Sequence, residues 1–283
     1  MKFPSPVKWV HIQAASGDSA DEDDVSEDSG YEAPETACKK MLRGVRGIIF
    51  DFDGTLFDNA FIAIRLISAY PLDILRIRRE RLVRRRFAGS DYSTPEKYNG
   101  AFFSELGRPF LRTPVGMRNW YFDRYMPRMV RVLKKYYKPR PGLVDLLRRI
   151  DNPASSTRMA IYSDYPFLKE RMEALGLFTT ERIRLYGPDS FGAQKPAVRP
   201  FLEIAKNMNL PPEEILVVGD REDTDGLGAF RAGMHFFCLE TGNKRYFRLD
   251  PYRRKPEVEP HGPNLLMYAG AWDRLIKMLM DRN

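Results

Sequence analysis

The 283-residue chain has few of the residue types that mark disulfide frameworks, membrane spans and histidine-based metal sites. It contains two cysteines, Cys38 and Cys238, which lie far apart, and three histidines without ligand spacing. This usage predicts a reducing compartment, so we expect a cytoplasmic protein without disulfides. No run of about 18 apolar residues occurs, so we expect no membrane span. The N-terminus lacks the basic-then-apolar pattern of a secretory signal.

Two nucleotide-binding patterns are also missing. No GxxxxGK[ST] sequence occurs, and no GxGxxG sequence follows a predicted strand. Nucleotide-driven and nicotinamide-dependent chemistry therefore have no support in the sequence.

Charge is distributed unevenly along the chain. Residues 14–37 carry nine acids and no base, which leaves +17 on the remaining residues when this −9 is taken from the formal total of +8. The acidic segment is poor in large apolar groups and cannot offset its ordering entropy by burial. We therefore expect residues 1–40 to be a disordered acidic extension. The basic remainder favours anionic substrates or partners.

The most informative segment runs from Ile48 to Asp58, where an apolar run ends in Asp51-Phe52-Asp53-Gly54-Thr55. Such a run bounded by a turn signal predicts a buried strand. Side chains two apart on a strand share a face, so both carboxylates are expected at its C-terminal end. Two close anions repel, and a divalent cation removes that difficulty because hard cations bind carboxylate oxygens. The alternative is a strand that ends in a solvated acidic turn.

Three later segments have related features. Met159–Asp164 is an apolar run that ends in Ser163, Gly192–Pro196 places Lys195 in a turn, and Ile215–Asp220 ends in Gly-Asp. Strands alternate with helices after residue 140, which predicts an α/β fold with a parallel, doubly wound sheet. Ligands of such sheets bind beyond the carboxyl ends of the strands, where Asp51, Ser163 and Asp220 are expected.

The chain between the first strand and the alternating part has a different pattern. Residues 61–137 show helical periodicity without β runs, and Pro127 is expected to kink or break the helix predicted for residues 120–137. Residues 241–264 are rich in Arg, Tyr and Pro and predict an extended excursion. Residues 265–280 predict a closing amphipathic helix.

The four segments, in this order and spacing, resemble the four motifs of the haloacid dehalogenase-like hydrolases. The resemblance covers roughly residues 45–240 and implies a Rossmann-like core, residues 41–60 and 138–283, with a helical cap formed by residues 61–137. Most members of this family are Mg²⁺-dependent phosphatases.

The resemblance also implies roles for the motif residues. Asp51 is the expected nucleophile that forms an aspartyl-phosphate, and Asp53 is the expected general acid and base. Asp53 must carry a proton when substrate binds, and a neighbouring carboxylate favours its protonated form. Ser163 is expected to bind the phosphate, and Lys195 to neutralise charge on the phosphoryl group.

The expected cofactor is Mg²⁺. Its ligands would be the carboxylates of Asp51 and Asp220 and the main-chain carbonyl of Asp53. Asp225 is expected to orient this shell rather than to bind the ion directly. The carboxyl group of Asp53 also separates two branches of the family, because dehalogenases lack an acid at this position.

An arginine run on a predicted helix leaves three interpretations open. It consists of Arg76, Arg78, Arg79, Arg81, Arg84, Arg85 and Arg86. The first interpretation is a solvated helix face that pairs with Glu80. The second is a surface that selects an additional anionic group on the substrate, and the third is a contact surface for nucleic acid.

The sequence thus predicts a phosphatase acting on a small phosphorylated metabolite. The alternative is a basic interaction protein, with nucleic acid as the less favoured partner, that keeps the fold with little turnover. The sequence does not indicate an oligomeric state.

Overall fold

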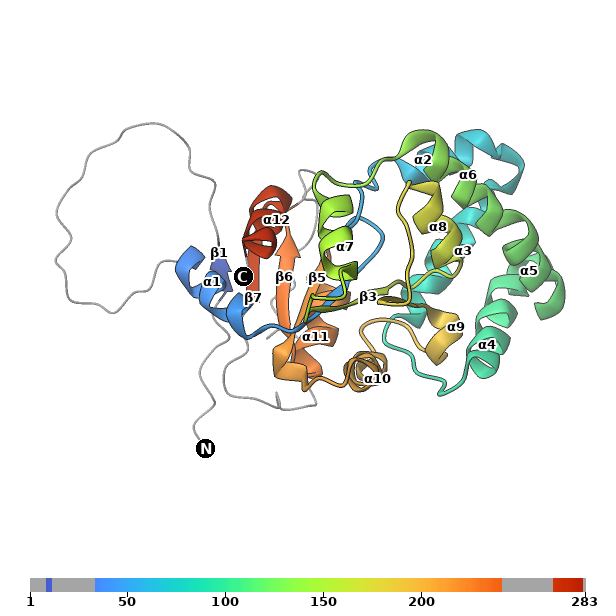
Figure 1. The fold of residues 1–283 in the computed structure, drawn as a ribbon. Coiled ribbons are helices and arrows are strands. Elements are labelled where there is room, and N and C mark those ends of the chain that lie inside the picture. Colours follow the sequence, from blue (N-terminus) through green and yellow to red (C-terminus); the bar gives the residue numbers. More distant parts are fainter. Residues whose placement is uncertain (1–8, 12–33, 241–266, 282–283) are drawn as a thin grey trace, which may run out of the picture.

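The computed structural model describes residues 9–11, 34–240 and 267–281 (Figure 1). Its centre is a seven-stranded sheet with the order β1-β7-β6-β5-β2-β3-β4, and every paired strand is parallel. The strands are β1 (Trp9–His11), β2 (Gly47–Phe50), β3 (Arg158–Tyr162), β4 (Ile183–Tyr186), β5 (Ile215–Gly219), β6 (His235–Leu239) and β7 (Met267–Gly270). The predicted α/β fold with a parallel sheet is confirmed.

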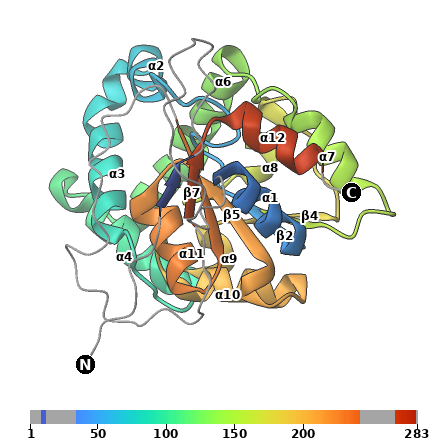
Figure 2. The ribbon, with the colours of Figure 1, turned by 90° about the vertical axis from the view of Figure 1, so that its left-hand side faces the viewer.

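Helices cover both faces of this sheet, as parallel sheets require. Figure 2 shows α1 (Pro34–Gly44), α7 (Leu143–Asp151) and α12 (Trp272–Met280) on one side, with α10 (Val198–Met208) and α11 (Leu227–Arg231) on the other.

The strands are apolar on both faces, because alternate residues enter different cores. In β2, Ile48 and Phe50 join the core under α7 and α12, whereas Ile49 joins the core with α10 residues. The same alternation occurs in β3, where Met159 and Ile161 belong to the first core and Ala160 to the second. This two-sided burial explains why these strands have continuous apolar sequences.

Six α-helices lie between β2 and β3, and all of them except α7 gather at one side of the molecule (Figure 1). The helices that gather there are α2 (Ile62–Ala69), α3 (Ile74–Phe87), α4 (Pro95–Gly107), α5 (Pro114–Trp120) and α6 (Met126–Tyr136). We call residues 61–137 the helical insert. The remaining helices are α8 (Leu168–Ala174), which contacts α6, and α9 (Pro188–Phe191), which contacts α4.

Pro127 was expected to kink or break the helix, and the structure shows no break there. The proline follows a π-helical turn at Tyr121–Tyr125. This wider turn interrupts the regular α-helical hydrogen bonds just before the proline, which has no amide hydrogen to contribute to them. The chain therefore stays helical from Pro114 to Tyr136.

The two ends of the chain differ from the expectations. The segment predicted as disordered, residues 1–40, contains β1 and the beginning of α1. The predicted helix over residues 265–280 is instead β7 followed by α12. A strand forms there because β6 offers an open edge, to which Met267–Gly270 pairs in parallel. The rest of the predicted acidic extension and the predicted excursion at 241–264 lie outside the described residues.

No helix within the described ranges combines the length and the apolar character that a bilayer crossing needs. Cys38 and Cys238 are both buried, and neither is in a disulfide.

Candidate active site

Three of the predicted site residues follow three adjacent strands. β2 lies between β3 and β5, and its register pairs Phe50 with Ile161 on one side and with Val218 on the other. Asp51 comes directly after β2, and its amide donates to the Val218 carbonyl at 2.8 Å. Ser163 comes directly after β3, and Asp220 directly after β5. The parallel register thus brings their backbones to one edge of the sheet.

Asp51 is buried and has a donor at each carboxylate oxygen. The Lys195 ammonium contacts Oδ1 at 2.6 Å, and the Thr55 hydroxyl donates to Oδ2 at 3.0 Å. Burial raises the pKa of Asp51 to about 7, against the lowering effect of Lys195, and the nearby carboxylates of Asp225 and Asp53 raise it further. The carboxyl group is therefore held in one orientation by donors suited to its charged form.

A cluster of acids surrounds the same lysine. Asp51, Asp220 and Asp225, which we call the acid cluster, are all buried, and one carboxylate oxygen from each lies within 4.8 Å of the others. Lys195 Nζ also contacts Asp225 Oδ1, at 2.8 Å. Burial alone lowers the pKa of Lys195, but Asp225 and Asp51 raise it well above its usual value.

The acid cluster has more negative charge than Lys195 can neutralise. Burial raises the pKa of Asp220 well above its usual range, and repulsion by Asp51 and Asp225 adds to this. Its Oδ1 is buried and has no hydrogen-bond partner among the described residues. A divalent cation fits this donor set, since buried carboxylate oxygens are the ligands that Mg²⁺ prefers. Asp225 belongs to the cluster by geometry, whereas the side chain of Asp53 does not.

The turn after Asp51 requires a glycine. Gly54 has φ of +92°, and a Cβ at this position would lie 2.3 Å from Asp220 Oδ2. Any larger residue would push into the acid cluster. Arg140, which follows the helical insert, fixes the turn by donating to the carbonyls of Gly54 and Thr55, both at 2.9 Å.

Asp53 lies against different partners from those expected. Its Oδ1 accepts from the Arg171 guanidinium, and its Oδ2 accepts from the Ser163 hydroxyl at 3.2 Å. The expectation was a carboxylate neighbour that would favour protonation. Asp51 is such a neighbour, since the Asp53 carboxylate acts on its pKa, but the direct partners of Asp53 are the Arg171 guanidinium and the Ser163 hydroxyl.

The loop that carries Lys195 is held by the helical insert and by the segment after β3. The Lys195 amide donates to Asp164 Oδ1 at 3.0 Å. The Gly89 amide donates to the Lys195 carbonyl at 3.0 Å, and the Tyr92 amide to the Gly192 carbonyl at 3.0 Å. The two contacts from the helical insert join residues that are about 100 positions apart, so the sequence order alone could not show them.

The arginine run divides into exposed and paired members. Arg78, Arg81 and Arg85 are exposed. Arg84 is buried and pairs with Glu80, as one interpretation proposed, although the pair is not solvated. Arg84 also donates to the Asp164 carbonyl, so one member of the run reaches the neighbourhood of the site. Contact with substrate or with nucleic acid stays a prediction.

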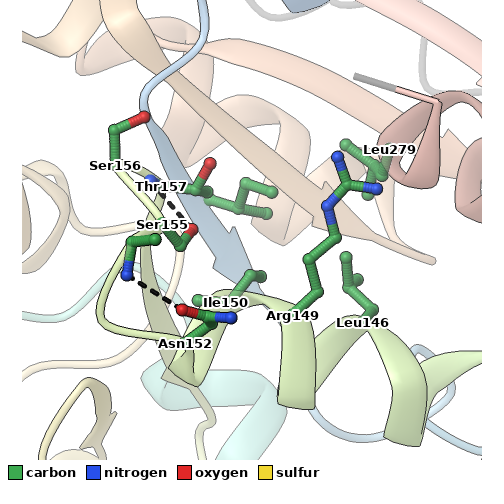
Figure 3. A pocket seen from close by; sticks show the side chains of 10 residues that line it. Leu146, Arg149, Ile150, Asn152, Ser155, Ser156, Thr157 and Leu279 are labelled. Atoms are coloured by element: carbon green, nitrogen blue, oxygen red, sulfur yellow. Dashed lines mark hydrogen bonds between the residues drawn. The ribbon is translucent and has the colours of Figure 1, made fainter. Parts of the chain in front are cut away.

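A hollow of about 310 Å³ lies away from the residues of the candidate site (Figure 3). It is lined by residues that end α7 and precede β3, including Arg149, Asn152 and Ser155. The Ala154 amide donates to Asn152 Oδ1 at 2.9 Å within a turn, Arg149 donates to the Met280 carbonyl, and Arg182 donates to the Ser155 carbonyl at 2.7 Å. The hollow lies at the amino end of β3, the opposite end from Ser163, and so has no part in the site at the carboxyl ends.

The buried carboxylate beside a lysine ammonium and the further acids lie at the carboxyl ends of a parallel sheet, where α/β proteins bind their ligands. Residues 45–233 match the family model described as haloacid dehalogenase-like hydrolase, and the chain belongs to this family. The prediction of a haloacid dehalogenase-like hydrolase is confirmed.

Relatives and solved structures agree with this assignment. The phosphoglycolate phosphatase of Salmonella typhi is 25% identical over 193 residues, which are 63% of this chain and 75% of that protein. That of Escherichia coli O157:H7 is 26% identical over 190 residues, 62% and 74% of the two chains.

Among solved structures, the L-2-haloacid dehalogenase RSc1362 is 19% identical with a TM-score of 0.53, covering 83% of this chain and 99% of its own. A hydrolase from Pseudomonas syringae is 22% identical with a TM-score of 0.51, covering 83% and 98%. At these identities the two structures show the shared fold alone.

Sequence reasoning did not find two residues of this site. Arg171 lies in the middle of a short helix, where an arginine carries no motif and is usually solvated. Arg140 precedes a Pro-Gly pair, which by itself indicates only a turn. Neither position has a local pattern that could have revealed its partner.

Proposed function

We propose that this hydrolase is a Mg²⁺-dependent phosphatase that acts on a small phosphorylated metabolite, such as a sugar phosphate or phosphoglycolate. The observation that carries the proposal is Asp51, held between Lys195 and Thr55 at contact distances of 2.6 and 3.0 Å. Such a carboxylate is immobilised, as an in-line nucleophile must be. The similarity to phosphoglycolate phosphatases supports the same reaction class.

The reaction would proceed in two displacements. An oxygen of Asp51 attacks phosphorus, the bond from phosphorus to the leaving oxygen breaks, and Asp53 gives that oxygen a proton. Water then attacks the phosphorus of the aspartyl-phosphate and gives its proton to Asp53. Inorganic phosphate leaves, and Asp51 is regenerated.

Positive charge at the transferred group comes from the chain and from the cation. Lys195 is placed to neutralise negative charge that develops on the equatorial phosphoryl oxygens, and the Ser163 hydroxyl to donate to one of them. Asp51, Asp220 and the Asp53 main-chain carbonyl would hold Mg²⁺, with Asp225 orienting Lys195 and the metal shell. Bound Mg²⁺ supplies the charge that the acid cluster lacks.

The presence of Asp53 favours ester hydrolysis over dehalogenation. An alkoxide leaving group needs a proton, whereas a halide does not. Asp53 has an ionisable group beside the phosphate-binding Ser163, at 3.2 Å from its hydroxyl. This contact supports the role proposed for Asp53 in protonating the leaving oxygen.

The test is hydrolysis of 4-nitrophenyl phosphate with Mg²⁺, with excess chelator, and with Asp51→Asn. Activity that needs Mg²⁺ and falls at least about 1,000-fold in Asp51→Asn supports the proposal. Asp145→Asn, an exposed acid on α7, is the matched control and should retain full activity. Activity that survives Asp51→Asn would refute Asp51 as nucleophile. A panel of phosphorylated metabolites would then identify the substrate.

We also propose a cytoplasmic location. Two buried cysteines outside any disulfide are consistent with a reducing compartment. Thiol labelling of the denatured protein, isolated under conditions that block oxidation, should find both thiols free.

A further inference from the structure

The Arg171 side chain is enclosed completely, with no exposed surface. Its Nη2 donates to Asp53 Oδ1, and its Nη1 donates to the Ser163 hydroxyl at 3.1 Å. Its guanidinium carbon lies 4.1 Å from the centre of the ring of Phe52, the residue between Asp51 and Asp53 in the sequence. A buried guanidinium is costly unless it is paired, and Asp53 is the carboxylate that pairs it.

The local structure explains how the side chain reaches this place. α8 begins at Leu168, after the loop that carries Ser163, and Arg171 lies one turn into the helix. Side chains on a helix lean toward its N-terminus, so Arg171 extends back toward that loop. It also donates to the Tyr165 carbonyl at 3.4 Å. One residue therefore holds the loop and the acid together.

The two oxygens of Asp53 have different partners as a result. Oδ1 is paired with a fully buried cation, whereas Oδ2 accepts only the Ser163 hydroxyl, at 3.2 Å, among the described contacts. The Asp53 side chain keeps 21% of its surface exposed, whereas that of Arg171 keeps none. An oxygen held by a weak neutral contact is easier to engage with substrate than one held by an ion pair.

We infer that Arg171 is a positioning residue, which anchors Oδ1 of Asp53 so that Oδ2 is the oxygen that exchanges protons with the leaving group and with water. This inference rests on the proposed phosphatase function. It assigns Arg171 no contact with substrate. The inference therefore requires that the effect of Arg171 pass through Asp53, rather than through Ser163, and depend on how much the leaving group needs a proton.

The test compares two phosphate esters in Arg171→Met, Arg171→Lys and the unaltered protein. An alkyl phosphate needs protonation of its leaving oxygen, whereas 4-nitrophenyl phosphate hardly does. In Arg171→Met we expect kcat/KM to fall about 10- to 100-fold for the alkyl ester and about threefold or less for the aryl ester. Arg171→Lys keeps a cation beside Asp53 and should restore most of the alkyl activity. Arg182→Met, an arginine that donates to the Ile150 and Ser155 carbonyls, should leave the ratio unchanged.

A double variant tests whether the effect passes through Asp53. Arg171→Met added to Asp53→Asn should cause almost no further loss, because the acting group is already gone. Equal losses on both esters, together with weaker inhibition by inorganic phosphate, would overturn the inference, since Arg171 would then act through Ser163. Should Arg171→Met fail to fold, Arg171→Gln takes its place with the same expected direction.

The outcomes separate this inference from the proposed function. A protein that hydrolyses neither ester in the presence of Mg²⁺ overturns both. An active protein whose ester ratio does not change in Arg171→Met overturns the role of Arg171 and leaves the phosphatase intact.

Discussion

The molecule contains two buried clusters of charge that differ in their balance. In the helical insert, Arg84 pairs with Glu80 at 2.8 Å, and the hydroxyls of Tyr121 and Tyr125 complete the contacts at 2.8 and 3.3 Å. We call these four residues the paired cluster. In the acid cluster, three carboxyl groups share Lys195, and Asp220 Oδ1 has no partner among the described residues.

The difference indicates what each cluster is for. A buried pair of one cation and one anion with satisfied hydrogen bonds is complete and holds helices in place. A buried set with surplus anions is incomplete, because repulsion and desolvation raise the pKa of its acids. We therefore expect the paired cluster to be structural and the surplus charge of the acid cluster to be balanced by a bound cation.

We expect the largest effect from a variant that removes the charge balance of the paired cluster. Glu80→Gln leaves the buried Arg84 without its counter-ion, and we expect the free energy of unfolding to fall by about 3–5 kcal/mol. Chemical denaturation measures this loss, and Mg²⁺ should not restore it. Arg81→Gln, an exposed arginine on the same helix, should change stability by less than about 0.5 kcal/mol. A Glu80→Gln protein as stable as the Arg81→Gln protein would contradict the structural role.

The second prediction concerns Asp220→Asn, a variant that reduces the surplus negative charge of the acid cluster. Mg²⁺ at 100 times its Kd should stabilise the unaltered protein by about 2.7 kcal/mol. Asp220→Asn should remove this gain and, in excess chelator, should unfold at a higher temperature than the unaltered protein, because one repelling carboxylate is gone. Thermal unfolding with and without Mg²⁺ measures both effects. Asp223→Asn, whose side chain pairs with Arg221 outside the acid cluster, should keep the full Mg²⁺ response. A variant of Asp220 that still responds to Mg²⁺ would remove this residue from the metal site.

The third prediction concerns pH, because protons compete with the cation. The pKa of Asp51 in the metal-free protein is raised to about 7, so below pH 7 this carboxyl must lose a proton before it can bind Mg²⁺. Because the carboxyl is half protonated at pH 7 and almost fully protonated at pH 6, we expect the Kd for Mg²⁺ to weaken roughly fivefold between these values, about 1 kcal/mol. Calorimetry in buffers of different ionisation enthalpy would measure the released proton. A Kd that is constant between pH 6 and pH 8 would show that Asp51 carries no such proton.

The same shift affects the stability of the metal-free protein. The folded state binds more protons than the unfolded state between the ordinary pKa of Asp51, 3.8, and its raised value of about 7. Its contribution to the free energy of unfolding therefore falls as pH rises through this window. Asp51→Asn should flatten that dependence.

Much of the fold could be predicted because its strands are buried on both faces. The segments around Ile49, Ala160 and Val217 are continuous apolar runs bounded by polar turns, and each forms a strand. Met267–Gly270 was missed because four residues without alternation do not differ from the beginning of the helix that follows them. Its strand conformation depends on the edge of β6, which is a tertiary contact.

The candidate site divides in the same way. Asp51, Ser163, Lys195 and Asp220 follow strands or turns, and the topology brings their segments together. The partner of Asp53 could not be predicted, because Arg171 lies 118 positions away on a helix without a motif. Glu80 and Arg84 are four apart, so their pairing was predictable, whereas their burial depends on how α3 packs in the insert.

The three amide-to-carbonyl contacts that join residues 89–92 to residues 192–194 and to the carbonyl of Lys195 have a mechanical consequence. If the helical insert swings away as a rigid piece with these contacts intact, it pulls the ammonium group from its carboxylate partners. If the ammonium stays, the contacts must break first. These contacts would therefore couple any opening of the insert to the position of Lys195.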